Sequence, residues 1–315
     1  NVYLTGIVRD KLGRKMSKTL GNSPDPLDLI AKYGADAVRI GMLLCASAGN
    51  DIFYDESQVE QGRNFCGKIW NSYRLVKGWA VSEKIGQPQS SAIAVKWFRN
   101  KLSQTIATVE DHYAKFRISD ALMSIYKLFW DDYCSWYLEL IKPASGQPID
   151  KVTYTETLGF FEALLKMIHP VMPFITEELW QDMAERKEGE TIMFQPTPVA
   201  GEFDEAFISS FELAEEAVNA IRGIRQQKNI SPKEELQVMF KGDFPAEMLD
   251  VVAKLANTSS AEVVADFGNT SEGVSQMVRT VEMYVPLTGK VNVEEEIAKL
   301  EAELDYQKKF LESVR

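Results

Sequence analysis

Residues 63–77 read Arg63-Asn64-Phe65-Cys66-Gly67-Lys68-Ile69-Trp70-Asn71-Ser72-Tyr73-Arg74-Leu75-Val76-Lys77, and this stretch decides the fold class. Its apolar side chains recur at spacings of four, four and three residues, which places them on one face of an α-helix. These positions are Phe65, Ile69, Tyr73 and Val76. Helical periodicity continues from about residue 55 to residue 185, so the sequence predicts a mainly α-helical protein built around a helical bundle.

The same stretch carries a polar row on roughly the opposite face of the helix. Lys68, Asn71 and Arg74 follow one another at intervals of three residues, and residues 63–82 contain four basic and no acidic side chains. Two cations and one amide could bind phosphates and read a base edge of an RNA. A plain solvent-facing row is the alternative interpretation.

A second motif precedes this helix. The segment Lys15-Met16-Ser17-Lys18-Thr19 lies between Gly13 and Gly21, which allow the chain to turn and to move. Two ammonium groups and a hydroxyl can neutralise a polyphosphate as its charge develops. Taken alone, the segment could equally be a solvated basic turn.

Four further blocks flank these motifs in a characteristic order. They are Tyr3-Leu4-Thr5-Gly6-Ile7-Val8-Arg9-Asp10, Asp25-Pro26-Leu27-Asp28, Tyr33-Gly34-Ala35-Asp36-Ala37-Val38-Arg39 and His169-Pro170-Val171-Met172-Pro173-Phe174-Ile175-Thr176-Glu177-Glu178-Leu179-Trp180. With residues 13–22 and 63–71, they resemble the KMSKS loop and the following segments of class I aminoacyl-tRNA synthetases of the valyl/isoleucyl/leucyl subgroup. The resemblance runs along essentially the whole chain.

The resemblance implies a different role for each of the two motifs. Lys15, Ser17 and Lys18 match the catalytic loop that contacts ATP, with Lys18 on the phosphates and the departing pyrophosphate. Thr19 supports the loop and stands where the family usually has a second serine. The parent enzyme would use ATP with Mg²⁺, whereas this chain should bind no cofactor tightly and needs no metal site of its own.

The helical domain would bind the anticodon arm of tRNA. The candidate tRNA-binding residues are Arg63, Lys68, Asn71, Arg74 and Lys77, with Arg63 and Lys77 as backbone contacts.

Within the subgroup, the valyl enzymes fit best. Ile221-Arg222-Gly223-Ile224-Arg225, followed by Asn229-Ile230-Ser231-Pro232, resembles their pattern, as does an acidic heptad tail from Val293. The expected function is therefore ATP-dependent charging of tRNA with valine. An isoleucyl or leucyl enzyme is the alternative within the class, and a non-catalytic RNA-binding or assembly module is the alternative outside it.

Composition sets the remaining limits. The 315 residues carry a net charge of −11, yet residues 1–80 hold 11 basic and 8 acidic residues, a local charge of +3. No apolar run approaches the ~20 residues needed to cross a membrane. Three separate cysteines and two histidines argue against a zinc site or a disulfide framework and favour the cytoplasm.

The pattern predicts four parts. Residues 1–50 would be the end of a nucleotide-binding α/β domain, with a strand over 2–8 and helices over 26–33 and 35–46. Residues 51–200 would form the helical anticodon-binding domain, 201–291 a small α+β unit, and 292–315 the start of a coiled-coil arm. We expect a C-terminal fragment that is non-catalytic alone and monomeric, with possible pairing through the truncated coil.

Overall fold

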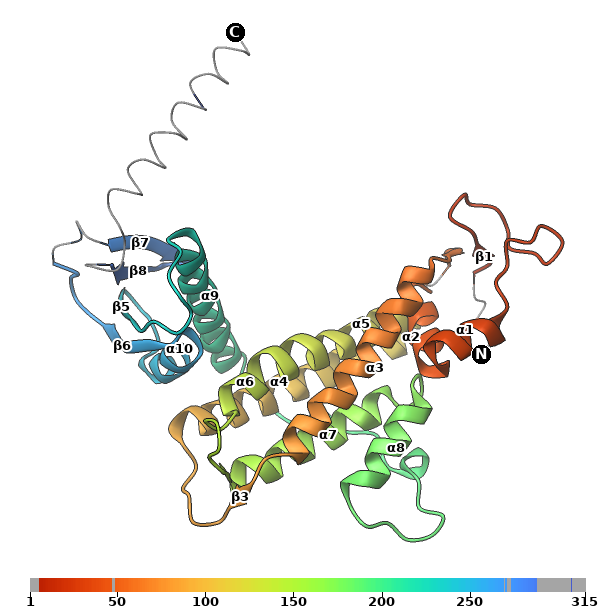
Figure 1. The fold of residues 1–315 in the computed structure, drawn as a ribbon, viewed down its shortest axis with the longest axis horizontal. Helices are drawn as coiled ribbons and strands as arrows, with labels where there is room; N and C mark the ends of the chain where they lie inside the picture. The colour runs from red at the N-terminus through yellow and green to blue at the C-terminus, as the bar shows by residue number, and fades with distance from the viewer. Residues whose placement is uncertain (1–5, 47–48, 269, 271–272, 288–306, 308–315) are drawn as a thin grey trace. The chain divides into compact units, whose positions relative to one another are not determined.

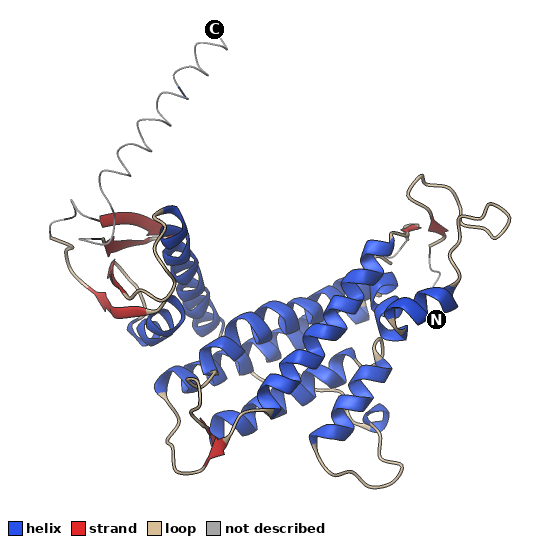
Figure 2. Cartoon of the chain, in the orientation of Figure 1, coloured by secondary structure: helices blue, strands red, loops and turns tan. Residues whose placement is uncertain are grey.

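The computed structural model describes residues 6–46, 49–268, 270, 273–287 and 307, and most of them are helical (Figures 1 and 2). The chain divides after Glu205 into two compact units, and each is described by itself. The predicted mainly α-helical fold is confirmed. The finer boundary expected between residues 50 and 51 falls inside the first unit and stays a prediction.

Helices dominate the first unit. They are α1 (Pro26–Tyr33), α2 (Ala35–Leu44), α3 (Glu56–Lys77), α4 (Gln89–Ala114), α5 (Ile118–Lys127), the π-helical segment η1 (Leu128–Tyr137), α6 (Leu138–Ile141), α7 (Lys151–Ile168), α8 (Pro173–Met183) and the 3-10 turn η2 (Ile192–Phe194). The helix predicted over 26–33 is α1, and the helix predicted over 35–46 is α2, which ends two residues earlier, at Leu44. At the start of α1, the Asp25 carboxylate accepts the Leu27 amide at 2.8 Å, with Pro26 at the first helical position.

The apolar face of α3 enters the bundle core as predicted. Phe65, Ile69, Tyr73 and Val76 are all at most 4% exposed. Phe65 packs edge-on against Phe129 of η1, and Tyr73 stacks on Phe161 of α7 with ring centres 5.4 Å apart. Each buried aromatic side chain removes a large apolar area from water, so α3 is held by the core along its whole length.

Two glycines let α2 and α3 cross unusually closely. A Cβ added to Gly62 would lie 2.3 Å from the Ala37 carbonyl oxygen, and one added to Gly41 would lie 2.6 Å from the Gln58 carbonyl oxygen. These distances are far inside normal contact, so only glycine fits at either position. The segment before α3 is therefore fixed to the bundle through backbone-to-backbone packing.

The strands among the described residues of the first unit are very short. β1 (Val8–Arg9) runs parallel to β2 (Ile52–Phe53), and β3 (Val81–Ser82) runs parallel to β4 (Ile149–Asp150). Residues 2–5 of the strand predicted over 2–8 lie outside the described residues. Of the described remainder only Val8 is in a strand, although the Ile7 carbonyl already accepts the Ile52 amide at 2.9 Å.

The second unit is a small α+β fold. Its elements are α9 (Glu205–Gln227), β5 (Leu236–Lys241), the 3-10 turn η3 (Ala246–Met248), α10 (Leu249–Ala256), β6 (Thr258–Val263), β7 (Gly273–Val278) and β8 (Val281–Pro286). The strands form one sheet in the order β6-β5-β8-β7, with β5 and β6 parallel and the other pairs antiparallel. The small α+β unit predicted over 201–291 is present in the described part of that range. The predicted coiled-coil start at 292–315 lies outside the described residues, Gln307 apart.

Arg225 of α9 explains part of the Ile221–Arg225 motif. Arg225 is 5% exposed, and its guanidinium donates to the carbonyls of Ser231, Glu234, Ala256 and Asn257 at 2.7–2.9 Å. The buried cation therefore ties the loop before β5 to the end of α10, which is a structural role.

Within the described residues, no helix is long and apolar enough to span a membrane.

Candidate functional site

The loop between β1 and α1 is organised by one carboxylate. Asp10 Oδ1 accepts the backbone amides of Leu12 and Arg14 at 3.0 and 2.9 Å. Its Oδ2 accepts the Asn22 side-chain amide at 3.0 Å and Arg14 Nε at 2.8 Å. The Asn22 hydrogen bond, helped by Arg14, holds the pKa of Asp10 well below its usual range. The two ends of the loop are therefore joined through Asp10.

Asn22 also orders the segment that carries the candidate catalytic residues. Its Oδ1 accepts the Ser17 amide at 2.9 Å, and its Nδ2 reaches the Lys15 carbonyl at 3.4 Å. The Ser17 hydroxyl accepts the Leu20 amide at 3.2 Å, and the Gly21 amide closes a turn onto the Lys18 carbonyl at 3.1 Å. Residues 15–22 are thus ordered by hydrogen bonds from the Asn22 side chain, the Ser17 hydroxyl and the Lys18 carbonyl.

The cations of this region fall into two groups. Arg9 pairs with Asp51, Lys11 with Asp55 at 3.0 Å, and Arg14 with Asp10 at 2.7 Å. By contrast, within the described residues no ion pair or side-chain hydrogen bond involves the ammonium groups of Lys15 and Lys18, and both residues are exposed. The arrangement leaves two positive charges available to an anion, on residues that precede and follow Ser17 in the chain.

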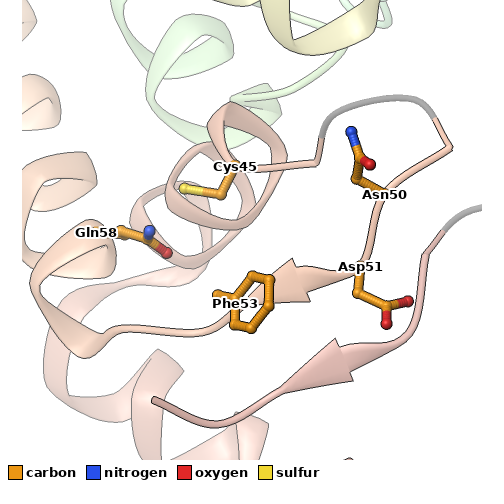
Figure 3. A pocket seen from close by; sticks show the side chains of 5 residues that line it. All are labelled: Cys45, Asn50, Asp51, Phe53 and Gln58. Atoms are coloured by element: carbon orange, nitrogen blue, oxygen red, sulfur yellow. The ribbon is translucent and has the colours of Figure 1, made fainter. Parts of the chain in front are cut away.

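Arg9 fixes the loop to the strand pair. Its guanidinium reaches Asp51 and also donates to the Gly13 carbonyl at 3.1 Å. Beyond β2 lies a hollow of about 530 Å³, lined by Cys45, Asn50, Asp51, Phe53 and Gln58. Figure 3 shows these side chains coming from the end of α2, from β2 and its approach, and from the start of α3.

The structure places the five candidate tRNA-binding residues of α3 in different surroundings. Asn71 and Arg74 are exposed, and within the described residues no hydrogen bond or ion pair involves either side chain. Lys68 is half-buried, with its ammonium 5.2 Å from the centre of the Trp130 ring. The predicted row of three is therefore an exposed pair with Lys68 at the edge of the packed face.

The other two cations have partners within the first unit. Lys77 Nζ lies 2.5 Å from Asp182 Oδ2 and sits over the Tyr73 ring at 5.6 Å. Arg63 Nη1 donates to the Lys32 carbonyl at 3.3 Å, at the end of α1. Of the five, Arg74 is the cation that the described structure leaves without such a contact.

Sequence reasoning missed two organising residues of the loop, Asp10 and Asn22. Both were visible as members of the motif blocks but had no assigned role. Aspartate and asparagine beside glycines are the side chains that bond their neighbours' amides in turns, which is the signal that could have found them.

The three cysteines are free, and burial raises the pKa of Cys66 and of Cys134 to about 12. Within the described residues, no group of three histidine, cysteine or acidic residues is placed to hold a metal ion.

Two sequence families match parts of the chain. The class I tRNA synthetases (I, L, M and V) match residues 1–55, and the anticodon-binding domain of tRNA ligase matches residues 95–240. Valine–tRNA ligases of Parabacteroides distasonis and Phocaeicola vulgatus are each 56% identical to this chain over all of its length. The chain belongs to the valine–tRNA ligase family of class I tRNA synthetases.

The chain spans 36% of the length of these two valine–tRNA ligases and aligns with their C-terminal portion. A valine–tRNA ligase of Fusobacterium nucleatum is 37% identical, with 100% of this chain and 37% of that protein aligned. Helix α3 lies between the two matched segments. Among solved structures, a LeuRS–tRNA–LeuAMS complex of Agrobacterium radiobacter K84 superposes with a TM-score of 0.46 at 20% identity, over 76% of this chain and 26% of that one.

Proposed function

We propose that the protein containing this chain charges tRNA with valine at the expense of ATP, in the cytoplasm. The observation that carries the proposal is the difference between the loop cations: Arg9, Lys11 and Arg14 are ion-paired, whereas among the described residues no ion pair involves Lys15 or Lys18. The relatives named above are valine–tRNA ligases, which favours valine over isoleucine or leucine. Three free thiols agree with a reducing compartment.

In this proposal the loop acts on the triphosphate of ATP. Attack of the valine carboxylate on the α-phosphorus releases pyrophosphate, and the step depends on positioning and charge neutralisation. Lys18 would stabilise the leaving pyrophosphate, with Lys15 beside it. Ser17 Oγ already accepts the Leu20 amide, so its hydroxyl hydrogen remains to donate to a phosphate oxygen. Thr19 is exposed at the following turn and would support the loop.

Mg²⁺ would accompany the nucleotide. The described residues offer no cluster that fits a bound metal, so no step of this mechanism is assigned to protein-held magnesium. The valine and the remainder of the nucleotide would bind to parts of the protein outside this chain.

The helical unit would bind the anticodon arm of tRNA through the exposed face of α3. Anticodon bases are unstacked, so their edges are open to side chains. In this proposal Asn71 would read a base edge, and Arg74 would bind a phosphate or a base. Lys68 can contribute from the edge of the face, while Arg63 and Lys77 would first have to loosen their contacts with Lys32 and Asp182.

Binding of this chain to transcripts of valine, isoleucine and leucine tRNA, across a salt series, tests the proposal. We expect preference for the valine transcript, loss of that preference when its anticodon is exchanged, and weaker binding of the Arg74→Ala variant. Equal binding to all transcripts, with the same salt dependence, would contradict anticodon reading by α3.

A further inference from the structure

Helix α2 carries two opposite charges that hold one segment of the bundle. Asp36 and Arg39 are three residues apart, so they lie on one side of the helix. Both reach residues 170–175, the stretch where α7 has ended and α8 begins. This stretch contains Pro170 and Pro173, which have no amide hydrogen, so it depends more than usual on outside partners.

Asp36 caps α8 from another helix. Asp36 is 6% exposed, and its carboxylate accepts the amides of Ile175 at 2.7 Å and Phe174 at 3.3 Å. The residue that precedes α8, Met172, supplies no side-chain cap of its own. A carboxylate at a helix N-terminus satisfies free amides and favours the helix dipole, so Asp36 replaces a local cap. Burial raises the pKa of Asp36, while these two amides stabilise its charged form.

Arg39 holds the other side of the same segment. Its Nε donates to the Val171 carbonyl at 2.7 Å, and its Nη2 donates to the Pro170 carbonyl at 3.0 Å. A planar guanidinium can bind two consecutive carbonyls at once, whereas a lysine ammonium is a single point of donation. Arg39 therefore binds carbonyls at the start of the 170–175 segment, and Asp36 binds amides at its end.

The element that makes this grip also belongs to the loop-bearing part of the chain. Helix α2 follows α1 directly, and α1 follows the loop of Lys15 and Lys18. The close α2–α3 crossing at Gly41 and Gly62 is a second attachment on another side of α2. Two independent contacts thus leave α2 little freedom to rotate against the bundle.

We propose that Asp36 and Arg39 are positioning residues that hold the loop-bearing segment on the helical domain, so that a bound tRNA meets the active site in one fixed geometry. The inference rests on the proposed function. Adenylate formation needs the loop and the nucleotide but not the tRNA. Transfer of the valyl group needs the tRNA end at the active site while its anticodon arm lies on the helical domain. Loosening the clamp should therefore slow transfer and spare adenylate formation.

The test uses a full-length ligase that contains this chain, with Arg39→Lys and Asp36→Asn variants. The matched control is Arg99→Lys, because Arg99 makes an exposed ion pair with Glu156 in the same unit. ATP–pyrophosphate exchange, tRNA affinity and the single-turnover transfer rate are measured for each. A displacement of about 1 Å can cost on the order of 10²-fold in rate. We expect transfer to fall at least about tenfold in both clamp variants, with exchange and tRNA affinity within about twofold of wild type.

Three results would overturn the inference. Transfer at the wild-type rate in Arg39→Lys would show that the clamp positions nothing. A parallel fall of exchange and transfer would show a role in stability alone, and melting temperatures would register it. The conservative Arg39→Lys variant decides the test if Asp36→Asn does not fold. A wild-type protein that fails to charge valine tRNA would instead refute the proposed function, and the inference would fall with it.

Discussion

The loop of residues 10–22 and helix α3 present cations in opposite ways. The loop is exposed, and its order comes from hydrogen bonds centred on Asp10 and Asn22. Helix α3 is held by a buried aromatic face and by a glycine contact with α2. A loop ordered by a few polar contacts can open and close, whereas a helix built into a core presents a fixed surface. The difference fits a mobile phosphate clamp and a rigid RNA-binding face.

The two regions share one rule. In each, some cations have a partner within the protein, and others have no ion pair or side-chain hydrogen bond to any described residue: Lys15 and Lys18 in the loop, Arg74 on the helix. A paired cation must lose its partner before it can bind a ligand, and an unpaired one need not. The unpaired cations are therefore the best candidates for contact with ATP and RNA.

Lys18→Ala should have the largest functional effect. Removing one donor that stabilises developing charge typically costs on the order of 10²–10³-fold in rate. We expect a loss of that size in ATP–pyrophosphate exchange by a full-length ligase, with valine affinity and folding almost unchanged. Lys11→Ala is the control, because Lys11 is paired with Asp55 and should leave the exchange rate near wild type. Equal losses in the two variants would contradict the functional difference between paired and unpaired cations of the loop.

Gly62→Ala should have the largest effect on stability. The added Cβ would meet the Ala37 carbonyl oxygen at 2.3 Å and Ile40 Cγ2 at 2.8 Å, and backbone cannot move aside as a side chain can. Overpacking of this kind costs roughly 1–3 kcal/mol, measurable by urea unfolding. Gly67→Ala in the same helix meets nothing within 4 Å and should stabilise by about 0.5–1 kcal/mol. If both variants shifted stability equally, the rigid crossing would be wrong.

Arg74→Ala and Lys77→Ala separate free from paired cations on α3. Loss of one phosphate contact lowers the slope of log affinity against log salt by about 0.7–0.9. We expect that decrease for Arg74→Ala and a smaller one for Lys77→Ala, because Lys77 is already paired with Asp182. Salt titrations of valine tRNA binding measure both slopes. The reverse order would show that Asp182 does not compete with RNA for Lys77.

The smallest expected effect concerns the pH below which the loop loses the hydrogen bonds of the Asp10 carboxylate. The pKa of Asp10 is lowered chiefly by the Asn22 hydrogen bond. Because the pKa of Asp10 is lower in the folded protein, its contribution to loop order is fully present above the pKa of an unfolded aspartate, about 3.9. That contribution is lost only as the pH falls through the lower pKa of the folded state. Amide NMR spectra of Leu12 and Arg14 should therefore be unchanged down to about pH 4. In Asn22→Ala the transition should move to higher pH, and an unmoved transition would contradict this explanation.

Much of the fold follows from local pattern. The i, i+4, i+8, i+11 spacing of Phe65, Ile69, Tyr73 and Val76 predicted a core face, and all four are buried. The helix predicted over 26–33 is present as α1, and Asp25 caps its start. These features depend on residues close in sequence, which is why the sequence alone sufficed.

The features that the sequence did not predict depend on distant partners. In the sequence, Lys68, Arg74 and Lys77 are three basic residues of one helix. The contacts of Lys68 with Trp130 and of Lys77 with Asp182 are tertiary, and they distinguish these two residues from Arg74. The clamp of Asp36 and Arg39 likewise joins residues more than 130 positions apart. Burial and pairing at such separations are set by packing, which no local periodicity records.

The most direct test of the account uses this chain and an isolated anticodon stem-loop of valine tRNA, labelled for fluorescence anisotropy. The account predicts binding that is weakened by exchange of the anticodon and by Arg74→Ala, and is unchanged in the Lys15→Ala, Lys18→Ala double variant. Binding that depends on the loop lysines and not on Arg74 would contradict the separation of the phosphate clamp from the RNA-binding face.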